Sequence, residues 1–164
     1  MTSILKVTEI QDPTNSNTAL EIDSSGRVTH PQKPYVFVAI EQGTAGWLAH
    51  ASNDAIKFNT VIEGDSNLFD TSTHKFTCPV GGLYLITYSI HSNSTAFQTQ
   101  VMRNTTQMQV GYQGDSDTEQ ASLVVDCDAN DELYVRSYGA AENYYAGSGT
   151  ALTRYTYATF TLIG

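Results

Sequence analysis

The sequence predicts an all-β protein of the sandwich or jelly-roll class, and three observations carry that prediction. Segments of strand length, rich in β-branched and aromatic residues, recur between clusters of Gly, Pro, Asn and Asp. Ten Tyr, six Phe and twelve Gly stand beside only eight Lys+Arg and seventeen Asp+Glu, which favours strands and turns over helices stabilised by charge pairs. No stretch repeats its apolar residues with the period of a helix.

The first 34 residues differ from the rest of the chain. The strand-like pieces "ILKVTEI", "ALEI" and "GRVT" are separated by the turn-forming stretches "QDPTNSNT" and "DSSG". Three such short strands bury too little apolar surface to be stable alone, so we expect this arm to dock on a larger body or on copies of itself. Pro31 and Pro34 make "HPQKP" a stiff connector, and a compact domain is expected over residues 35–164. The apolar candidates for attachment are Leu5, Val7, Ile10, Leu20, Ile22 and Val28.

Strand-length segments follow the connector in a regular series, with shorter strands expected around residues 47–48 and 56–62. The main segments are "YVFVAI" from Tyr35, "GLYLITYSI" from Gly82, "FQTQVMRN" from Phe97, "TQMQVGYQ" from Thr106, "QASLVVDCD" from Gln120, "DELYVRSYG" from Asp131 and "LTRYTYATFTLI" from Leu152.

These segments fall into two groups. "FQTQVMRN", "TQMQVGYQ" and "DELYVRSYG" alternate or nearly alternate, with Met108, Val110 and Tyr112 expected inward, which is typical of an outer sheet facing water. "YVFVAI", "GLYLITYSI", "ASLVV" and "YTYATFTLI" are apolar on both faces. Such a sheet needs a neighbour on its second face, and in an antiparallel protein without covering helices we expect that neighbour to be another copy of the sheet.

The interface candidates come from this second group. Tyr84 or Leu85 is expected to face the symmetry axis, together with Tyr155 and Tyr157 near the C-terminus. Which parity faces the axis stays open, because a strand that is apolar on both faces does not specify its register.

Charge and composition exclude several classes of partner. A formal net charge of −9, with no cluster of Lys or Arg, argues against nucleic acid, whose binding depends on cations that neutralise phosphates. The opening "MTSILKVTEIQD" lacks the basic region and apolar run of a signal peptide, and no run approaches the ~18 apolar residues of a membrane span. We therefore expect synthesis in a cytosol without membrane insertion. Cys78 and Cys127 are expected to act as small buried hydrophobes, and whether they pair stays open.

No catalytic constellation is present in the sequence. The four His residues are scattered, and neither Gly-x-Ser-x-Gly nor His-Glu-x-x-His occurs, so we expect no enzyme, no catalytic residue and no cofactor. "GDSDTE" places Asp115, Asp117 and Glu119 at alternate positions and offers oxygens to calcium. The helix-loop calcium pattern is not met, because Gln120 and Asp126 stand where its Gly and Glu belong, so a solvated acidic loop without metal is the expectation.

A loop rich in Gly, Ala and Ser carries three tyrosines. Tyr138, Tyr144 and Tyr145 in "SYGAAENYYAGSGT" are candidates for receptor binding, since exposed aromatic rings stack on sugars or on protein surfaces. The alternative is that the tyrosine pair packs inward and caps the end of the sandwich.

The stretch "HKFTCPVGGLYLITYSI" resembles the signature of the globular head of the complement C1q family, which is related in fold to tumour necrosis factor. The resemblance extends over Tyr35 to Gly164 and departs at Thr159, where the family commonly has Gly, and at Ile86, which replaces a usual Phe. It implies a ten-stranded antiparallel jelly roll that assembles as a tight homotrimer, and some such heads bind calcium. The shared residues are Phe76, Thr77, Pro79, Gly82, Tyr84 and Tyr88.

The arm has a resemblance of its own. "LKVTEIQDPTNSNTALEIDSSGRV" is similar to the openings of tail-fibre and other appendage proteins of tailed bacteriophages, especially marine ones. Together the two resemblances imply a virion structural protein, assembled in the cytoplasm of a bacterial host. Its trimeric knob would bind a host-surface glycan or protein, and its arm would join other virion proteins. The alternatives are a capsid or neck decoration protein with a mechanical role and, less favoured, a cellular C1q-like recognition module.

Overall fold

The computed structural model describes residues 7–11, 18–22, 24–29, 33–93, 98–112, 118–139, 142–148 and 155–164. The chain divides into two compact units, Met1–Lys33 and Pro34–Gly164. This division falls one residue before the boundary expected from the connector. The first unit is called the arm and the second the knob, and each is described by itself.

The arm contains a small antiparallel sheet with the strand order β1-β2-β3. Its register sets Ile10 opposite Leu20 and Ile22 opposite Val28, which gathers the four apolar side chains on one face. No second layer covers this face among the described residues of the arm, and three of the four side chains are exposed. The three short strands expected from the sequence are present. They are β1 (Glu9–Gln11), β2 (Thr18–Ile22) and β3 (Val28–Thr29).

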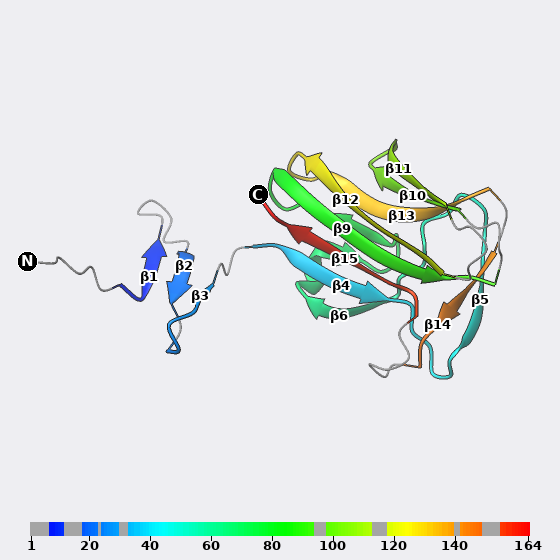
Figure 1. Cartoon of the computed structure of the whole chain (residues 1–164), viewed down its shortest axis with the longest axis horizontal. Helices are drawn as coiled ribbons and strands as arrows, with labels where there is room; N and C mark the ends of the chain where they lie inside the picture. Colours follow the sequence, from blue (N-terminus) through cyan, green and yellow to red (C-terminus); the bar gives the residue numbers. More distant parts are fainter. Residues whose placement is uncertain are drawn as a thin grey trace, which may run out of the picture. The chain divides into compact units, whose positions relative to one another are not determined.

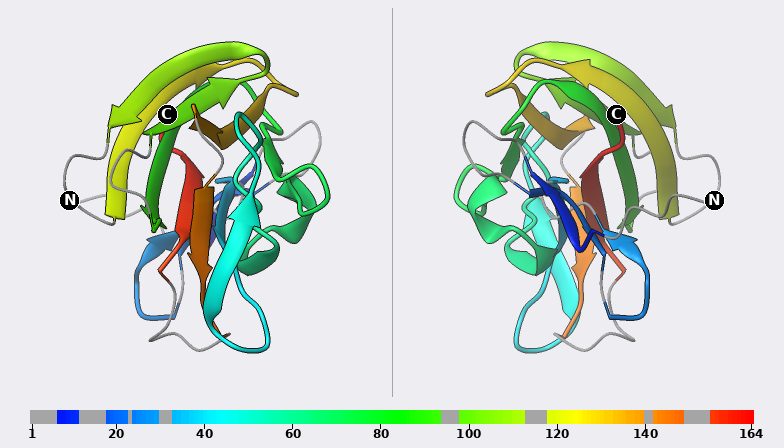
Figure 2. Two further views of the ribbon diagram at one scale, coloured as in Figure 1. Left: turned by 90° about the vertical axis from the view of Figure 1, so that its right-hand side faces the viewer. Right: turned by 90° about the vertical axis from the view of Figure 1, so that its left-hand side faces the viewer.

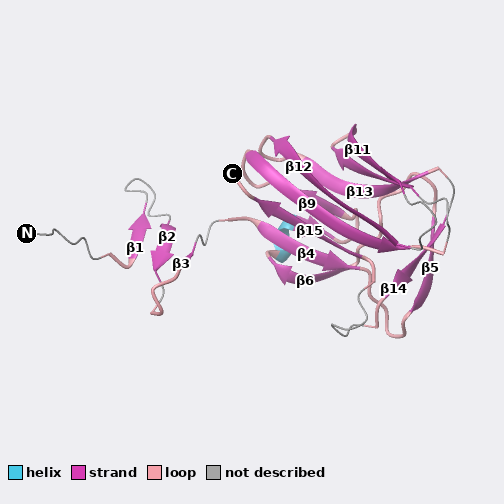
Figure 3. Ribbon diagram, in the orientation of Figure 1, coloured by secondary structure: helices cyan, strands magenta, loops and turns pink. Residues whose placement is uncertain are grey.

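The knob is built from two five-stranded antiparallel sheets (Figures 1 and 3). The first, called the β9 sheet, has the strand order β12-β9-β15-β4-β6, and the second, called the β10 sheet, has the order β11-β10-β13-β8-β7. The β9 sheet comprises β4 (Tyr35–Ala39), β6 (Thr60–Gly64), β9 (Gly82–His91), β12 (Thr118–Cys127) and β15 (Tyr157–Leu162). The β10 sheet comprises β7 (Phe69–Asp70), β8 (Lys75–Thr77), β10 (Gln98–Arg103), β11 (Thr106–Tyr112) and β13 (Glu132–Tyr138).

The connections between the strands are those of a jelly roll. The chain crosses between the sheets from β6 to β7, from β8 to β9, from β9 to β10, from β11 to β12 and from β12 to β13. A two-stranded ribbon of β5 (Gly46–His50) and β14 (Glu142–Ala146) lies outside both sheets. The helical content of the described chain is one 3₁₀ turn, η1 (Ser66–Leu68), and no described helix has the length and apolar character needed to cross a membrane. The all-β jelly roll expected from the sequence is confirmed.

The division of the strands into two groups is also confirmed. The four segments that are apolar on both faces became β4, β9, β12 and β15, which are neighbours in the β9 sheet. The alternating segments became β10, β11 and β13 in the other sheet. One detail of the outer group is wrong, because Met108 on β11 is exposed rather than inward, while the side chains of Val110 and Tyr112 lie outside the described residues.

The core fills the space between the two sheets. On β9 the side chains of Tyr84, Ile86, Tyr88 and Ile90 are buried there, while Leu83 and Leu85 alternate onto the opposite face. Aromatic rings join the layers, since the Phe160 ring on β15 stacks on Phe76 of β8 at a centroid distance of 5.3 Å. Cys78 and Cys127 are free thiols buried in the same cluster, and burial raises the pKa of both.

The two ends of the knob differ in what they carry. The backbone N–H of Leu162 donates to the carbonyl of Pro34 at 2.9 Å, and that of Leu83 donates to the carbonyl of Gly164 at 2.6 Å, so Pro34 and the C-terminus share one end of the knob, called the basal end. The β5–β14 ribbon lies at the opposite, distal end (Figures 1 and 2). Gly82 marks the basal end with φ of +150°, where an added Cβ would lie 2.5 Å from the Gly164 oxygen.

Candidate self-association face and distal aromatic cluster

The face of the β9 sheet that points away from the core is here called the open face. Its side chains form cross-strand rows, because the register of the sheet sets the outward residues of neighbouring strands opposite one another. The basal row is Val124–Leu85–Thr161–Tyr35, the middle row is Ser122–Thr87–Thr159–Phe37, and the next row is Gln120–Ser89–Tyr157–Ala39.

The basal part of the open face is apolar. Leu83, Val124 and Ile163 are exposed there, and Leu85 is half-buried between them and the middle row. The large apolar side chains of these strands therefore face both the core and the surface. A contiguous group of exposed apolar side chains is typical of a contact surface, whereas single exposed apolar residues are scattered over most proteins.

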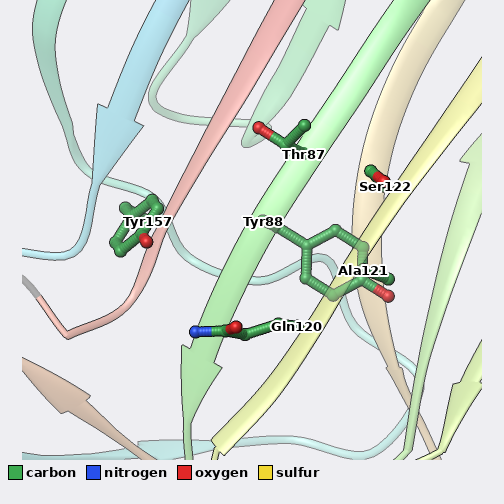
Figure 4. Close-up of a pocket in the computed structure, with 6 residues that line it drawn as sticks. All are labelled: Thr87, Tyr88, Gln120, Ala121, Ser122 and Tyr157. Carbon is green, nitrogen blue, oxygen red and sulfur yellow. The ribbon is translucent and has the colours of Figure 1, made fainter.

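The middle of the open face is polar and slightly hollowed. The hydroxyls of Thr87 and Thr159 form a hydrogen bond across β9 and β15. Beside them lies a shallow depression of about 360 Å³ bordered by residues of β9, β12 and β15 (Figure 4). The Tyr157 ring packs edge-on against Phe37 at 5.8 Å, which fixes the aromatic border of this depression. The lining residues are Thr87, Tyr88, Gln120, Ala121, Ser122 and Tyr157.

Four aromatic rings meet at the distal end of the open face and are called the distal aromatic cluster. His91 at the end of β9 stacks on Trp47 of β5 at 5.3 Å, and the imidazole Nδ1 lies 3.1 Å from the Thr118 hydroxyl. Tyr145 of β14 is paired with Trp47 in the ribbon and packs edge-on against it at 5.0 Å. Tyr155 closes the cluster, 5.0 Å from Tyr145 and 5.7 Å from His91. The rings of Trp47 and Tyr155 thus pack against His91 at the distal end of the open face.

The structure settles which parity of β9 faces outward. Tyr84 is wrong as an interface residue, because its side chain is fully buried in the core and its hydroxyl donates to the Val80 carbonyl at 2.8 Å. Burial raises the pKa of Tyr84 to about 12. Leu85 and Tyr157 lie on the open face, whereas Tyr155 belongs to the distal aromatic cluster.

The three tyrosines of the distal loop have separate environments. Tyr144 is wrong as a receptor-binding residue, because its side chain is buried and its ring lies 4.6 Å from His50 in the interior. Tyr138 ends β13 in the β10 sheet and is exposed, without a place in the cluster described above. Tyr145 is half-buried within that cluster. The sequence reasoning missed Trp47 and His91, although the single Trp of the chain, placed on an expected short strand, was an available signal.

The acidic segment proposed as a weak calcium candidate does not form a surface site through Glu119. Its side chain is buried between the sheets, where Thr99 donates to the carboxyl group and the Tyr88 hydroxyl donates at 3.3 Å. Burial raises the pKa of Glu119 against the opposing effect of these hydrogen bonds. Asp115 and Asp117 lie outside the described residues, so the three carboxylates are not shown together.

Four attachment candidates of the arm, Ile10, Leu20, Ile22 and Val28, lie on one face of its sheet. Val7, Ile10, Ile22 and Val28 are exposed and Leu20 is half-buried, while Leu5 lies outside the described residues. Their role in attachment stays a prediction.

The fold and the open face together define a jelly-roll domain of the C1q and tumour necrosis factor class. The family model described as the C1q domain matches residues 36–161, and the chain belongs to that family. Among curated relatives, the human complement C1q and tumor necrosis factor-related protein 9B is 28% identical over 92 residues, covering 54% of this chain and 28% of the relative. The mouse complement C1q and tumor necrosis factor-related protein 9 is 28% identical over 87 residues, covering 51% and 26%. The chain therefore spans about a quarter of the length of these relatives.

Solved structures show the same fold at low identity. The globular domain of the zebrafish complement 1qA protein has a TM-score of 0.59 at 17% identity, covering 81% of this chain and 98% of the other. Murine APRIL has a TM-score of 0.60 at 9% identity, with 80% and 100% covered. The vertex protein P5 of the bacteriophage PRD1 has a TM-score of 0.53 at 16% identity, with 80% and 97% covered. At these identities the likeness establishes the fold and nothing further.

Proposed function

We propose that the chain is a non-enzymatic virion structural protein whose knob forms a homotrimer through the open face of the β9 sheet. The observation that carries the trimer is the uncovered apolar surface around Leu85, with Leu83 and Val124 exposed beside it. Domains of this family typically form homotrimers, which supports three copies rather than two. Each protomer would bury the basal and middle rows of its open face against its neighbours, which removes that apolar surface from water and leaves the distal aromatic cluster outside the contact.

The chemistry of the open face suits contact between identical copies. Three of the four residues in its middle row, Ser122, Thr87 and Thr159, bear hydroxyl groups, which can both donate and accept hydrogen bonds when they meet their own copies. Charged residues stand at the margin, with Asp126 beside Leu83 and Glu63 beside Phe37. A self-contact across the middle of this face therefore avoids burying like charges.

The arm is proposed to attach the knob to the virion. Its sequence resembles the openings of phage appendage proteins, and its small sheet exposes an apolar face that includes Ile10, Ile22 and Val28. Three arms from one trimer would dock together, so that attachment gains strength from multivalency without a strong single contact. The arm joins the knob through Pro34 at the basal end, and the distal end of the knob is proposed to meet a host-surface glycan or protein.

A capsid or neck decoration protein is the second candidate function. The fold that the knob shares with the PRD1 vertex protein P5 is the observation that supports this alternative, since a phage protein described as a vertex protein carries a similar jelly roll. In this case the open face and the arm keep the roles given above, and the distal end has a mechanical role. Imaging labelled copies on the particle separates the two locations.

Deletion of residues 1–34 tests the attachment. The expected product is a folded trimeric knob that is absent from purified particles, because the strands of the knob make all their ladder pairs within residues 35–164. A matched pair of full-length variants refines the test. Ile22→Asp on the apolar face should reduce incorporation, whereas Glu21→Ala on the opposite face should not. A truncated knob that decorates particles at normal occupancy would place the attachment site in the jelly roll and refute the proposal.

A further inference from the structure

We infer that the distal aromatic cluster is a binding site for a neutral pyranose sugar, held by stacking on Trp47 and Tyr155. This inference deepens the proposed function, since it assigns the ligand class of the end that the proposal leaves free. It rests on four rings contributed by β5, β9, β14 and the segment that leads into β15.

The first step is the exposure of the rings. Trp47 and Tyr155 are each 45% exposed, although both pack against His91. A Trp at the surface ordinarily leaves apolar area in contact with water, and here the exposed Tyr155 ring packs on the same two rings, His91 and Tyr145, as Trp47 does. The rings are held by mutual contacts, so the surface is preorganised rather than formed by one free side chain.

The second step is the chemistry of the ligand. The four rings themselves carry no carboxylate, ammonium or guanidinium group, so this stacking surface selects a ligand by its apolar face rather than by its charge. The rings combine apolar faces with polar tips, namely the indole N–H, the phenol hydroxyls and the imidazole. A pyranose has the matching arrangement, with C–H groups across one face and hydroxyls around its rim. The net charge of −9 disfavours nucleotides, whose bases would also stack but whose phosphates would be repelled.

The third step is the size of the site. Two side chains that are each less than half exposed supply far less area than the roughly 800 Å² per partner of a standard protein–protein interface. The area fits one or two sugar rings, for which aromatic walls and a few polar groups are the usual lining. In the proposed trimer the three distal ends would present three such sites, which strengthens the binding of a repeating polysaccharide through multivalency.

The experiment uses the full-length protein and the fluorescence of Trp47, which is the single tryptophan of the chain. The probes are methyl α-D-mannopyranoside, methyl β-D-glucopyranoside and N-acetyl-D-glucosamine, with the acyclic polyol sorbitol as the control that keeps the hydroxyls and removes the ring. The expected result is a saturable change in emission with at least one pyranoside and none with sorbitol. The absence of a response to all three pyranosides, or an equal response to sorbitol, overturns the inference.

Matched variants locate the response. Tyr155→Ala should weaken binding by about tenfold or more, as is common for a central aromatic contact, and Tyr155→Phe should retain most of it. Tyr138→Ala is the control, because Tyr138 is exposed to 46% against 45% for Tyr155 and lies in the other sheet. A loss with Tyr138→Ala and none with Tyr155→Ala would overturn the assignment.

The mass of the same samples separates this inference from the proposed function. A trimer without a sugar response refutes the sugar site alone, whereas a monomer with a response refutes the trimer alone. Acrylamide quenching adds a further arm, since Trp47 should be equally accessible in the trimer and in a dissociated variant. Protection of Trp47 in the trimer would make the cluster a contact between protomers and overturn the inference.

Discussion

Val124→Asp is the substitution expected to separate the knobs without unfolding them. Val124 lies in the basal row of the open face beside Leu85 and is 48% exposed in the single protomer. The protomer should therefore tolerate a carboxylate at this position, because the side chain already reaches water. In the proposed trimer the same carboxylate would be buried against an apolar neighbour.

The magnitude follows from the area that the trimer would cover. The exposed part of Val124 amounts to about 70 Å², which at about 25 cal/mol per Å² is worth about 2 kcal/mol for each copy. Three copies sum to about 5 kcal/mol, or a factor of more than about 1,000 in the equilibrium between trimer and monomers. Burying a carboxylate without a partner adds several kcal/mol to this loss.

The assay is sedimentation velocity at micromolar concentration, with circular dichroism to confirm the fold. Val80→Asp is the matched control, because Val80 is 46% exposed but lies in the turn before β9 rather than on the open face. The variant at Val124 should sediment as a folded monomer while the variant at Val80 remains a trimer. An intact trimer in both variants would show that the open face is not the interface.

The remaining predictions concern the fold within one protomer. Phe160→Ala should lower the free energy of unfolding by about 3–5 kcal/mol in urea titrations, because the ring is fully buried against Phe76; a loss below about 1 kcal/mol would contradict that packing. Burial raises the pKa of Glu119 in the folded state above its usual 4.5, so the natural protein loses stability as the pH rises from 4.5 through the folded pKa. The Glu119→Gln variant does not titrate at this position, so its stability relative to the natural protein should increase over the same range. Parallel pH profiles of the two proteins would show that Glu119 is not the buried titrating group. Gly64→Ala should lower the melting temperature, because φ is +97° and an added Cβ would lie 2.3 Å from the Tyr35 oxygen; an unchanged melting temperature would contradict this close approach.

The partition of strands between the sheets was predictable from the sequence. A strand with water on one face must alternate, whereas a strand between two apolar layers need not, and this difference in pattern distinguishes β9 and β15 from β10 and β13. The resemblance around Tyr84 and Tyr88 added the jelly-roll connections, which periodicity alone does not supply.

The sequence could not predict which alternate residues of β9 face the core, because both sets are apolar. With apolar residues at both Tyr84 and Leu85, the pattern gives no preference for one face. In the structure the Tyr84 ring packs against Phe76, and its hydroxyl donates a hydrogen bond to the Val80 carbonyl. Both partners lie outside β9 itself, so only the packed fold reveals them.

The distal end was the least predictable part of the candidate site. The four rings of the cluster come from segments that are far apart in the sequence, so no local spacing of residues predicts their contact. They belong to Trp47, His91, Tyr145 and Tyr155. Tyr144 and Tyr145 are neighbours in the chain, and strand alternation sends one inward and the other to the cluster.

The mass of the full-length protein in solution tests the central claim most directly. Sedimentation equilibrium at micromolar concentration should give three times the chain mass of 17.9 kDa, because the open face of each protomer is covered by its neighbours. A single species of 17.9 kDa would leave that apolar face exposed to water and would contradict the account.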